Sequence, residues 1–324
     1  MGSGFLLVSQ INNAWQLYLL YVVIIGIGTS GIWVPLLSTV VKWFTKRRSM
    51  MTGIVIAGLH IGTLIFPPLN NWLISIYDWR ITYLIMGGIV FVIVILSAQF
   101  LRHKPAQMGQ LAYGESESKK GGAKPGIDGF TFREAVYTNQ FWFAAALVFC
   151  VGFWRVAILV HIVPHVTDLG FSTASSANVL ATIGGLSVPG TVIGGSIADR
   201  IGSRQAYLIS FILLLAASFL LLQAKELWML YLFAVIFGLG GGMVGPLHSP
   251  LLAALFGLRS HGMIFGATNV GYTIGAALGP YMAGYIFDIT GSYQTAFLTC
   301  AVVGIVGFIC VALLRPTKKL GGRI

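Results

Sequence analysis

The chain has 324 residues, of which 56% are hydrophobic and 9% are charged, with a mean hydropathy of +0.85 and a net charge of +11. This composition excludes a water-soluble globular domain, and its uncharged runs of about 20 apolar residues are long enough to cross a bilayer as helices. The runs are apolar on every face, which excludes the alternating strands of a transmembrane β-barrel. The predicted class is an all-α polytopic membrane protein.

Polar breaks divide the chain into nine predicted spans that follow a short apolar segment at residues 2–11. The spans are 16–41, 50–76, 81–101, 140–165, 176–198, 206–224, 228–256, 263–287 and 293–314. Residues 102–138 form the one long polar connection, whose Gly, Lys, Glu and Ser content is typical of a flexible linker. Near its end, Thr131 and Glu134 have the spacing of a capping box, which predicts a short helix before the next span.

The basic residues lie on one side of the predicted membrane. If successive connections alternate sides, 17 of the 20 Lys and Arg share a side, which includes the linker and the C-terminal tail. By the positive-inside rule this side is cytoplasmic, and the protein is expected to be a multi-pass protein of the cell (inner) membrane. The positive charge is thus explained by topology and by contact with lipid headgroups, and it does not indicate a nucleic-acid partner.

No pattern of reactive residues indicates an enzyme, a cofactor or a metal site. Cys150, Cys300 and Cys310 lie within apolar runs without the spacing of metal ligands or of a disulfide framework. The sequence contains no nucleophile elbow, HExxH motif or carboxylate pair.

An internal repeat joins the early spans to the last three. At an offset of 213 residues, "WQLYL" from Trp15 aligns with "WMLYL" from Trp228, and the same offset pairs Met50, Gly53, Gly58, Gly62 and Pro67 with Met263, Gly266, Gly271, Gly275 and Pro280. Parallel halves joined by a long loop are typical of one architecture of transporters, with the substrate path between the halves.

The repeat also predicts how the chain is divided. At the same offset, the counterpart of the first span after the linker would lie before residue 1. The chain is therefore expected to lack two spans and part of a third. We therefore expect an incomplete N-terminal half at 1–101, from the end of helix 3 to helix 6, a cytoplasmic linker at 102–138, and a six-helix C-terminal half with a cytoplasmic tail at 139–324.

Three stretches carry a resemblance to a known family. They are "WFTKRRSMMTGIVIAGLHIG" at 43–62, "GGSIADRIGSR" at 194–204 and "HIVPHVTDLGFS" at 161–172. They resemble the major facilitator superfamily, and within it the branch of monocarboxylate transporters and oxalate/formate antiporters. One departure is that the Asp and Arg common on helix eight of that branch correspond here to Ser187 and Thr191.

The resemblance implies a major facilitator fold of twelve helices, of which this chain holds nine and a partial one. It implies a monomeric secondary transporter that moves a small organic anion, similar to a monocarboxylate, by alternating access. Coupling is either proton symport or anion exchange. The alternative is a membrane fragment of such a carrier that does not transport.

Arg155 is the predicted centre of the substrate site. It lies about halfway along its span, where an unpaired cation costs about 2.5 to 3.5 kcal/mol on insertion scales. Its planar fork suits a carboxylate, so we interpret it as the anion-binding residue. The alternative is a structural pair with a polar residue of a neighbouring helix.

Other polar residues within spans complete the hypothesis. His60, His248, Asn269 and Tyr272 are predicted to line the substrate cavity, although each could equally form a hydrogen bond between helices. His161 and His165 are four residues apart near the outer end of one span, which suits a gate or a proton relay, or interfacial caps.

A cytoplasmic turn is predicted to act as a conformational lock. Asp199, Arg200, Gly202 and Arg204 form the turn, and Asp199 is expected to accept from the N-terminus of the helix at Ser49, behind the basic residues Lys46, Arg47 and Arg48. Gly53, Gly58 and Gly62 are expected to line the contact of that helix with the other half. Gly271 and Gly275 form a second stripe of small residues that lets backbones approach, and in the complete fold that the resemblance implies, their helix packs across the halves against the second helix, which this chain is expected to lack.

Overall fold

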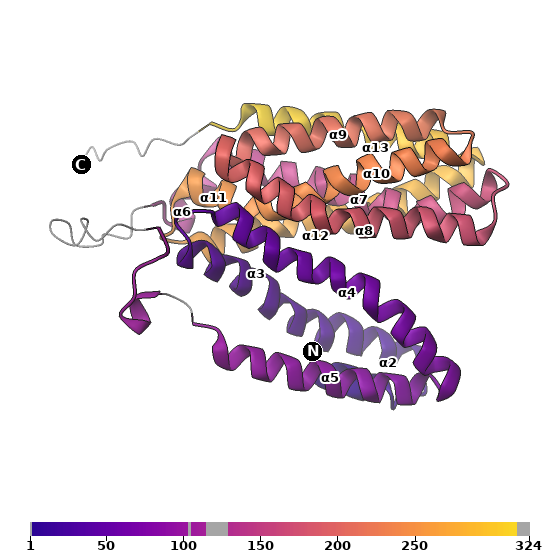
Figure 1. Cartoon of the computed structure of the whole chain (residues 1–324), viewed down its shortest axis with the longest axis horizontal. Coiled ribbons are helices and arrows are strands. Elements are labelled where there is room, and N and C mark those ends of the chain that lie inside the picture. Colours follow the sequence, from indigo (N-terminus) through magenta and orange to yellow (C-terminus); the bar gives the residue numbers. More distant parts are fainter. Residues whose placement is uncertain (1, 103–104, 115–128, 316–324) are drawn as a thin grey trace.

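The computed structural model describes residues 2–102, 105–114 and 129–315, and its regular elements in these ranges are all helices (Figure 1). Residues 103–104, the linker segment 115–128 and the tail 316–324 lie outside the described residues. The predictions for the linker can therefore be compared with the structure only at 105–114 and 129–138, and those for the tail remain predictions. The described helices confirm the predicted all-α class.

The helices form two groups on either side of the linker. The first group contains α1 (Gly2–Val8), α2 (Ala14–Leu19), η1 (Leu20–Ile25), α3 (Gly26–Trp43), α4 (Arg48–Ile76) and α5 (Trp79–Phe100), and the linker carries η2 (Pro105–Met108) and α6 (Phe132–Val136). The second group contains α7 (Asn139–Asp168), α8 (Thr173–Ile201), α9 (Ser203–Gln223), α10 (Leu227–Val244), η4 (Gly245–Leu247), α11 (His248–Phe256), α12 (His261–Thr290) and α13 (Tyr293–Leu313).

Within the described residues, eight helical stretches are long and apolar enough to cross a membrane. They are Ala14–Trp43, Arg48–Phe66, Trp79–Phe100, Asn139–Asp168, Thr173–Ile201, Ser203–Gln223, Leu227–Phe256 and Tyr293–Leu313. They coincide with eight of the nine predicted spans. The ninth, 263–287, lies in α12, a helix of 30 residues whose many small and polar side chains keep it outside this apolar set.

The helix boundaries repeat at the offset found in the sequence. Adding 213 to the ends of Ala14–Trp43, Arg48–Ile76 and Trp79–Phe100 gives 227–256, 261–289 and 292–313. The corresponding helical stretches run over 227–256, 261–290 and 293–313. The two copies therefore share their element boundaries as well as their Gly and Trp positions.

The two described ends of the linker bind equivalent points of the two groups. The amide of Tyr113 donates to the carbonyl of Trp43 (N···O 2.8 Å), and the amide of Phe130 donates to the carbonyl of Phe256 (2.8 Å). Residues 43 and 256 are themselves 213 apart. Thr131 and Glu134 form the predicted capping box at the start of α6, because each side chain accepts from the backbone amide of the other residue (3.2 and 2.7 Å).

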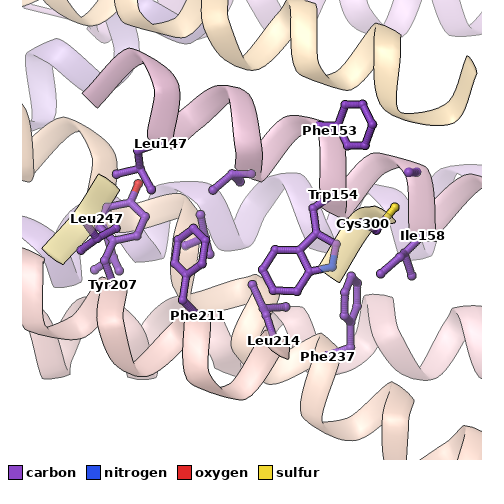
Figure 2. Packing of buried hydrophobic residues seen from close by; sticks show 14 of the residues in the cluster. Leu147, Phe153, Trp154, Ile158, Tyr207, Phe211, Leu214, Phe237, Leu247 and Cys300 are labelled. Atoms are coloured by element: carbon purple, nitrogen blue, oxygen red, sulfur yellow. The ribbon is translucent and has the colours of Figure 1, made fainter. Parts of the chain in front are cut away.

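The core of the second group surrounds α7. Figure 2 shows Trp154 of α7 beside Phe211 and Leu214 of α9, with Phe237 of α10 close by. The Trp154 side chain is 1% exposed, and its indole N–H donates to the hydroxyl of Ser218 (3.0 Å). Between membrane helices, close packing and hydrogen bonds of this kind supply the stability that hydrophobic burial supplies in water.

The glycine stripe of α12 packs against α7, within the same group. A Cβ atom added at Gly271 would lie 2.7 Å from the carbonyl oxygen of Ala145, and one added at Gly275 would clash with the carbonyl oxygen of Phe149. The expectation that small residues let backbones approach here is therefore confirmed, and the helix approached is α7 of the same group. The spacing of small residues shows that backbones approach closely there, but it carries no information on which helix approaches.

The glycines of α4 differ from the prediction. A Cβ at Gly53 would lie 2.5 Å from the carbonyl oxygen of Thr191 in α8, as expected for a contact between the groups. In contrast, no described atom lies within 4 Å of a Cβ at Gly58, and one at Gly62 would meet only Phe66 of the same helix. Figure 1 shows the reason, since α4 diverges from α8 beyond its N-terminal part.

These positions give a matched pair of substitutions. Gly275→Val should lower the melting temperature of the purified protein in detergent by several degrees or more, because overpacking a close helix contact costs about 1 to 3 kcal/mol. Gly62→Val, at the equivalent position of the repeat, should leave the melting temperature nearly unchanged. Equal melting temperatures for the two variants would contradict the close contact between α12 and α7.

Candidate functional site

The two helix groups meet through the side chain of Asp199. The backbone amide of Ser49 donates to Oδ1 of Asp199 (N···O 2.8 Å), and the amide of Met50 donates to Oδ2 (2.9 Å). Both amides belong to the first turn of α4, where helix amides are unpaired and the helix dipole favours an anion. A Cβ added at Gly195 would clash with the carbonyl oxygen of Ser49, so the backbones of α8 and α4 also approach closely here.

We call this end of the molecule the basic end, because it carries Lys42, Arg48 and Arg259. Gly202 and Arg204 of the predicted lock make their contacts within the second group. Gly202 forms the turn between α8 and α9 with φ of 94°, and Arg204 donates to the carbonyls of Val311 and Ala312 (3.2 and 2.6 Å) at the end of α13.

The basic residues before Ser49 shape the turn from α3 to α4. The Lys46 amide donates to the carbonyl of Tyr113 (3.2 Å), Arg47 adopts a left-handed backbone with φ of 62°, and Nε of Arg48 donates to the carbonyl of Phe44 (2.7 Å). Arg200 is exposed. Asp199 is thus the residue of this set whose side chain hydrogen-bonds the amides of the other group.

A cavity of about 850 Å³ lies between the groups. Its described lining comes from α3, α4, α7, α9, α12 and the junction of α10 and α11. The structure brings the five predicted binding residues together there, since the lining includes Arg155, His60, His248, Asn269 and Tyr272. These residues come from four helices, so no single-helix pattern in the sequence contains the site.

A break in one span places His248 at the cavity. Gly245–Leu247 form a 3₁₀ turn, η4, between α10 and α11, and Pro246 lies within it. Proline lacks an amide hydrogen and its ring disrupts the α-helical pattern, so the span changes geometry at this point. Val244, Gly245 and His248 line the cavity on both sides of the break.

Arg155 is the one charged side chain in the described lining of the cavity. Among the described residues its guanidinium forms no hydrogen bond or ion pair, and no Asp or Glu lines the cavity with it. Gly241 makes room for it, because a Cβ at Gly241 would lie 3.3 Å from Nε of Arg155. The five donors of the guanidinium are thus available to a ligand.

Ser187 and Thr191 lie outside the described lining of the cavity. Their side chains are 2% and 0% exposed, and both hydroxyls donate to backbone carbonyls of α8, with that of Ser187 also reaching Gly238 of α10 (3.2 Å). In this structure α7 supplies the charged group of the cavity. Ser187 and Thr191 of α8, which stand where the related branch commonly has Asp and Arg, serve helix packing.

Tyr207 is a cavity residue that the sequence analysis missed. It lies in α9, is 0% exposed and lines the cavity, and its hydroxyl has no hydrogen-bond partner among the described residues. The same holds for Nδ1 of His248. A single Tyr in an apolar run gives no signal of its own, because a tyrosine ring is as common in a core as in a site.

His161 and His165 face the second group and are not among the described cavity residues. His161 Nε2 lies 3.0 Å from the carbonyl oxygen of Pro280, and its ring packs on Tyr293. The His165 ring packs edge-on against Tyr293 and Phe297. These contacts favour the interfacial, structural interpretation of the two histidines over a relay that includes the cavity.

A family model described as the Major Facilitator Superfamily matches residues 1–222 and 179–322. The chain is 26% identical over 306 residues to monocarboxylate transporter 4 of Gallus gallus, covering 92% of this chain and 63% of that protein. It is 24% identical to monocarboxylate transporter 12 of Mus musculus, covering 98% and 70%. It is also 24% identical to monocarboxylate transporter 2 of Homo sapiens, covering 93% and 66%. The chain thus spans about two thirds of the length of these curated relatives.

A solved structure has a similar fold. The crystal structure of the major facilitator transporter FucP in the outward conformation superimposes with a TM-score of 0.70, covering 98% of this chain and 80% of that one at 14% identity. At this identity the likeness concerns the fold.

The Asp199 contact leads to a second prediction. Asp199→Asn removes the charge and one of the two acceptors, and because a hydrogen bond to a charged group contributes about 1.5 to 3 kcal/mol, the groups should separate more readily at the basic end. The measurement is the distance between spin labels at Lys46→Cys and Gln205→Cys by pulsed electron spin resonance. The three native cysteines are buried, which favours selective labelling of the introduced ones.

Asp78→Asn is the matched control. Asp78 also caps a helix, accepting from the Ile81 amide (2.8 Å), but both residues belong to the first group. It should leave the label distance unchanged. An identical distance distribution in the Asp199 variant and the wild type would contradict the role of this contact.

Proposed function

Because this chain belongs to the Major Facilitator Superfamily, we propose that it binds a small organic anion with one carboxylate at Arg155 and carries it across the membrane. The observation that supports this proposal is the unpaired guanidinium in the cavity between the two helix groups. A cation without a partner within a membrane span is costly, and an anionic ligand offsets that cost.

The lining favours a monocarboxylate over a more highly charged anion. With one cation in the described lining, one carboxylate is neutralised and a second would stay uncompensated in a site of low polarity. Most other described lining residues are apolar or small, including Trp33, Val34, Leu37, Ile56 and Phe265, which suits a short hydrocarbon substituent. Asn269 and Tyr272 add hydrogen-bonding groups that can orient the ligand.

The contacts between the groups suggest an alternating-access mechanism. The hydrogen bonds of Asp199 and the close approach of Gly53 and Gly195 hold the groups together at the basic end. We take this as the outward-facing state, with the basic end in the cytoplasm of a cell-membrane protein. Residues 1–101 and 139–324 then act as the two moving parts, joined by the linker 102–138, and Asp199 acts as the lock that opens on inward access.

The third prediction tests Arg155. Arg155→Gln should weaken binding of the best-binding short monocarboxylate about 10- to 100-fold, since charged hydrogen bonds contribute about 1.5 to 3 kcal/mol. Arg155→Lys should give an intermediate affinity, because it keeps the charge and loses the bidentate fork. Calorimetric titration of the purified full chain with formate, acetate, L-lactate and pyruvate measures both effects.

Lys225→Gln is the control, because Lys225 is an exposed cation in the turn between α9 and α10. It should bind like the wild type. Unchanged affinity in Arg155→Gln would exclude Arg155 as the anion site.

Uptake of the same labelled anion into liposomes separates transport from binding alone. Binding without uptake would favour the alternative of a membrane protein that holds the anion and does not carry it. Preloading the liposomes with unlabelled anion distinguishes exchange from proton-driven uptake. The length of the chain relative to its curated relatives makes this control necessary.

The fourth prediction concerns Tyr207. Tyr207→Phe removes a buried hydroxyl that has no described partner, so the folded protein should be as stable as the wild type or more stable. If the hydroxyl donates to the bound carboxylate, the affinity should fall about 3- to 10-fold. Melting temperature and calorimetry on the same preparation separate the two effects, and an unchanged affinity would remove Tyr207 from the site.

A further inference from the structure

We propose that His248 takes up one proton when the carboxylate binds, and that this proton crosses the membrane with the anion. The inference rests on the function proposed above and assigns it a coupling residue. His248 is 6% exposed, lies at the start of α11 and lines the cavity.

A hydrogen bond fixes the tautomer of the His248 ring. The Thr268 hydroxyl lies 3.0 Å from the Ile264 carbonyl and 3.1 Å from the Phe265 carbonyl, so its hydrogen is donated within α12. It therefore accepts from the Nε2–H of His248 (3.1 Å). This leaves Nδ1 as a basic nitrogen, which is buried and has no partner among the described residues.

None of the titratable groups around His248 supplies a negative charge that could stabilise a proton on Nδ1. Arg155 and His60 line the same cavity from α7 and α4, and Tyr207 and Tyr272 line it from α9 and α12. No Asp or Glu belongs to the described lining. In the empty cavity a second positive charge near Arg155 is therefore unfavourable, and His248 is neutral.

The side of His248 away from the cavity is also basic. Phe265 separates the His248 ring from His261, with ring centroids 5.2 Å and 6.1 Å from its own, and Lys42 and Arg48 interact electrostatically with His261. None of these groups supplies negative charge. The acidic group that the site needs in order to hold a proton must arrive with the substrate.

Binding of a carboxylate reverses this balance. The anion offsets the charge of Arg155, so a proton from the water of the open side can rest on Nδ1 of His248 while the net charge of the site stays the same as in the empty cavity. In this step an O–H bond of hydronium in that water breaks and the N–H bond at Nδ1 forms. One proton and one monovalent anion then cross together, and the net charge moved is zero.

The adjacent residue connects His248 to the contact that opens. The Ser249 hydroxyl lies 2.9 Å from Nε2 of His261 and 3.5 Å from the Leu37 carbonyl of the first group. When the groups separate at the basic end, this contact is lost and water reaches the residues beside His248. The proton leaves to that water after the anion has gone, because the positive charge of Arg155 is again uncompensated.

The experiment measures protons taken up per anion bound. The purified full chain is titrated with the best-binding carboxylate of the four above in phosphate and in Tris buffer at the same pH, and the difference in binding enthalpy gives the proton number. We expect about one proton in the wild type and about none in His248→Gln, which should bind the anion more weakly but measurably. The wild-type affinity should rise toward acidic pH, by up to about tenfold per pH unit, and that of His248→Gln should not.

Two further variants complete the test. His161→Gln, whose ring packs outside the described cavity lining, should keep the wild-type proton number, and His248→Asn replaces His248→Gln if the melting curve shows that the latter is unfolded. Anion binding without proton uptake in the wild type would overturn the role of His248 and leave the anion site intact. Proton uptake that is lost in His60→Gln and kept in His248→Gln would overturn it too. Failure of the wild type to bind any carboxylate would contradict the proposed function and this inference together.

Discussion

Two hydrogen bonds from the first turn of α4 to the Asp199 carboxylate hold the two helix groups together at one end of the molecule. Asp199 lies in the last turn of α8, and Gly53 and Gly195 let the backbones of α4 and α8 come close enough for the bonds to form. Beyond this contact α4 diverges from α8, and the cavity lies between the groups. The contacts of one carboxylate thus join the two groups at the end where α4 and α8 approach each other.

The polar groups of the cavity are left incomplete by the protein itself. Arg155 has no described partner, Nδ1 of His248 and the Tyr207 hydroxyl have none, and the described lining contributes no acid. Buried polar groups are normally paired, because desolvation without a hydrogen bond is costly. Here the unpaired groups are of two kinds that face the same cavity: the Arg155 guanidinium and the Tyr207 hydroxyl are donors, and Nδ1 of His248 is an acceptor. An anion accompanied by a proton satisfies all three, which neither species does alone.

The sequence predicts the helices and five residues of the cavity lining, but not which helix faces touch. Uncharged runs, polar breaks and the capping box at Thr131 depend on local physics, so they give the spans correctly. Arg155 was predictable because a charge in an apolar run is costly wherever it lies. Gly58 and Gly271 are equivalent in the repeat, yet one is open and the other abuts α7. A pattern of small residues predicts close packing but does not show which helix is the partner. A single tyrosine in an apolar helix, such as Tyr207, does not indicate a site.

The repeat explains why the site lies where it does. Ile56, Leu59 and His60 of α4 are equivalent to Asn269, Tyr272 and Thr273 of α12, and all six line the cavity. The cavity is therefore bounded by the same faces of the two copies, as expected for a site between parallel repeats. The backbone follows the repeat, whereas the chemistry does not: α12 presents polar groups where α4 presents mainly apolar ones, and Arg155 comes from α7, which lies outside the repeated stretches. This difference gives the cavity a polar side and an apolar side, which is the polarity of a carboxylate that carries a short hydrocarbon group.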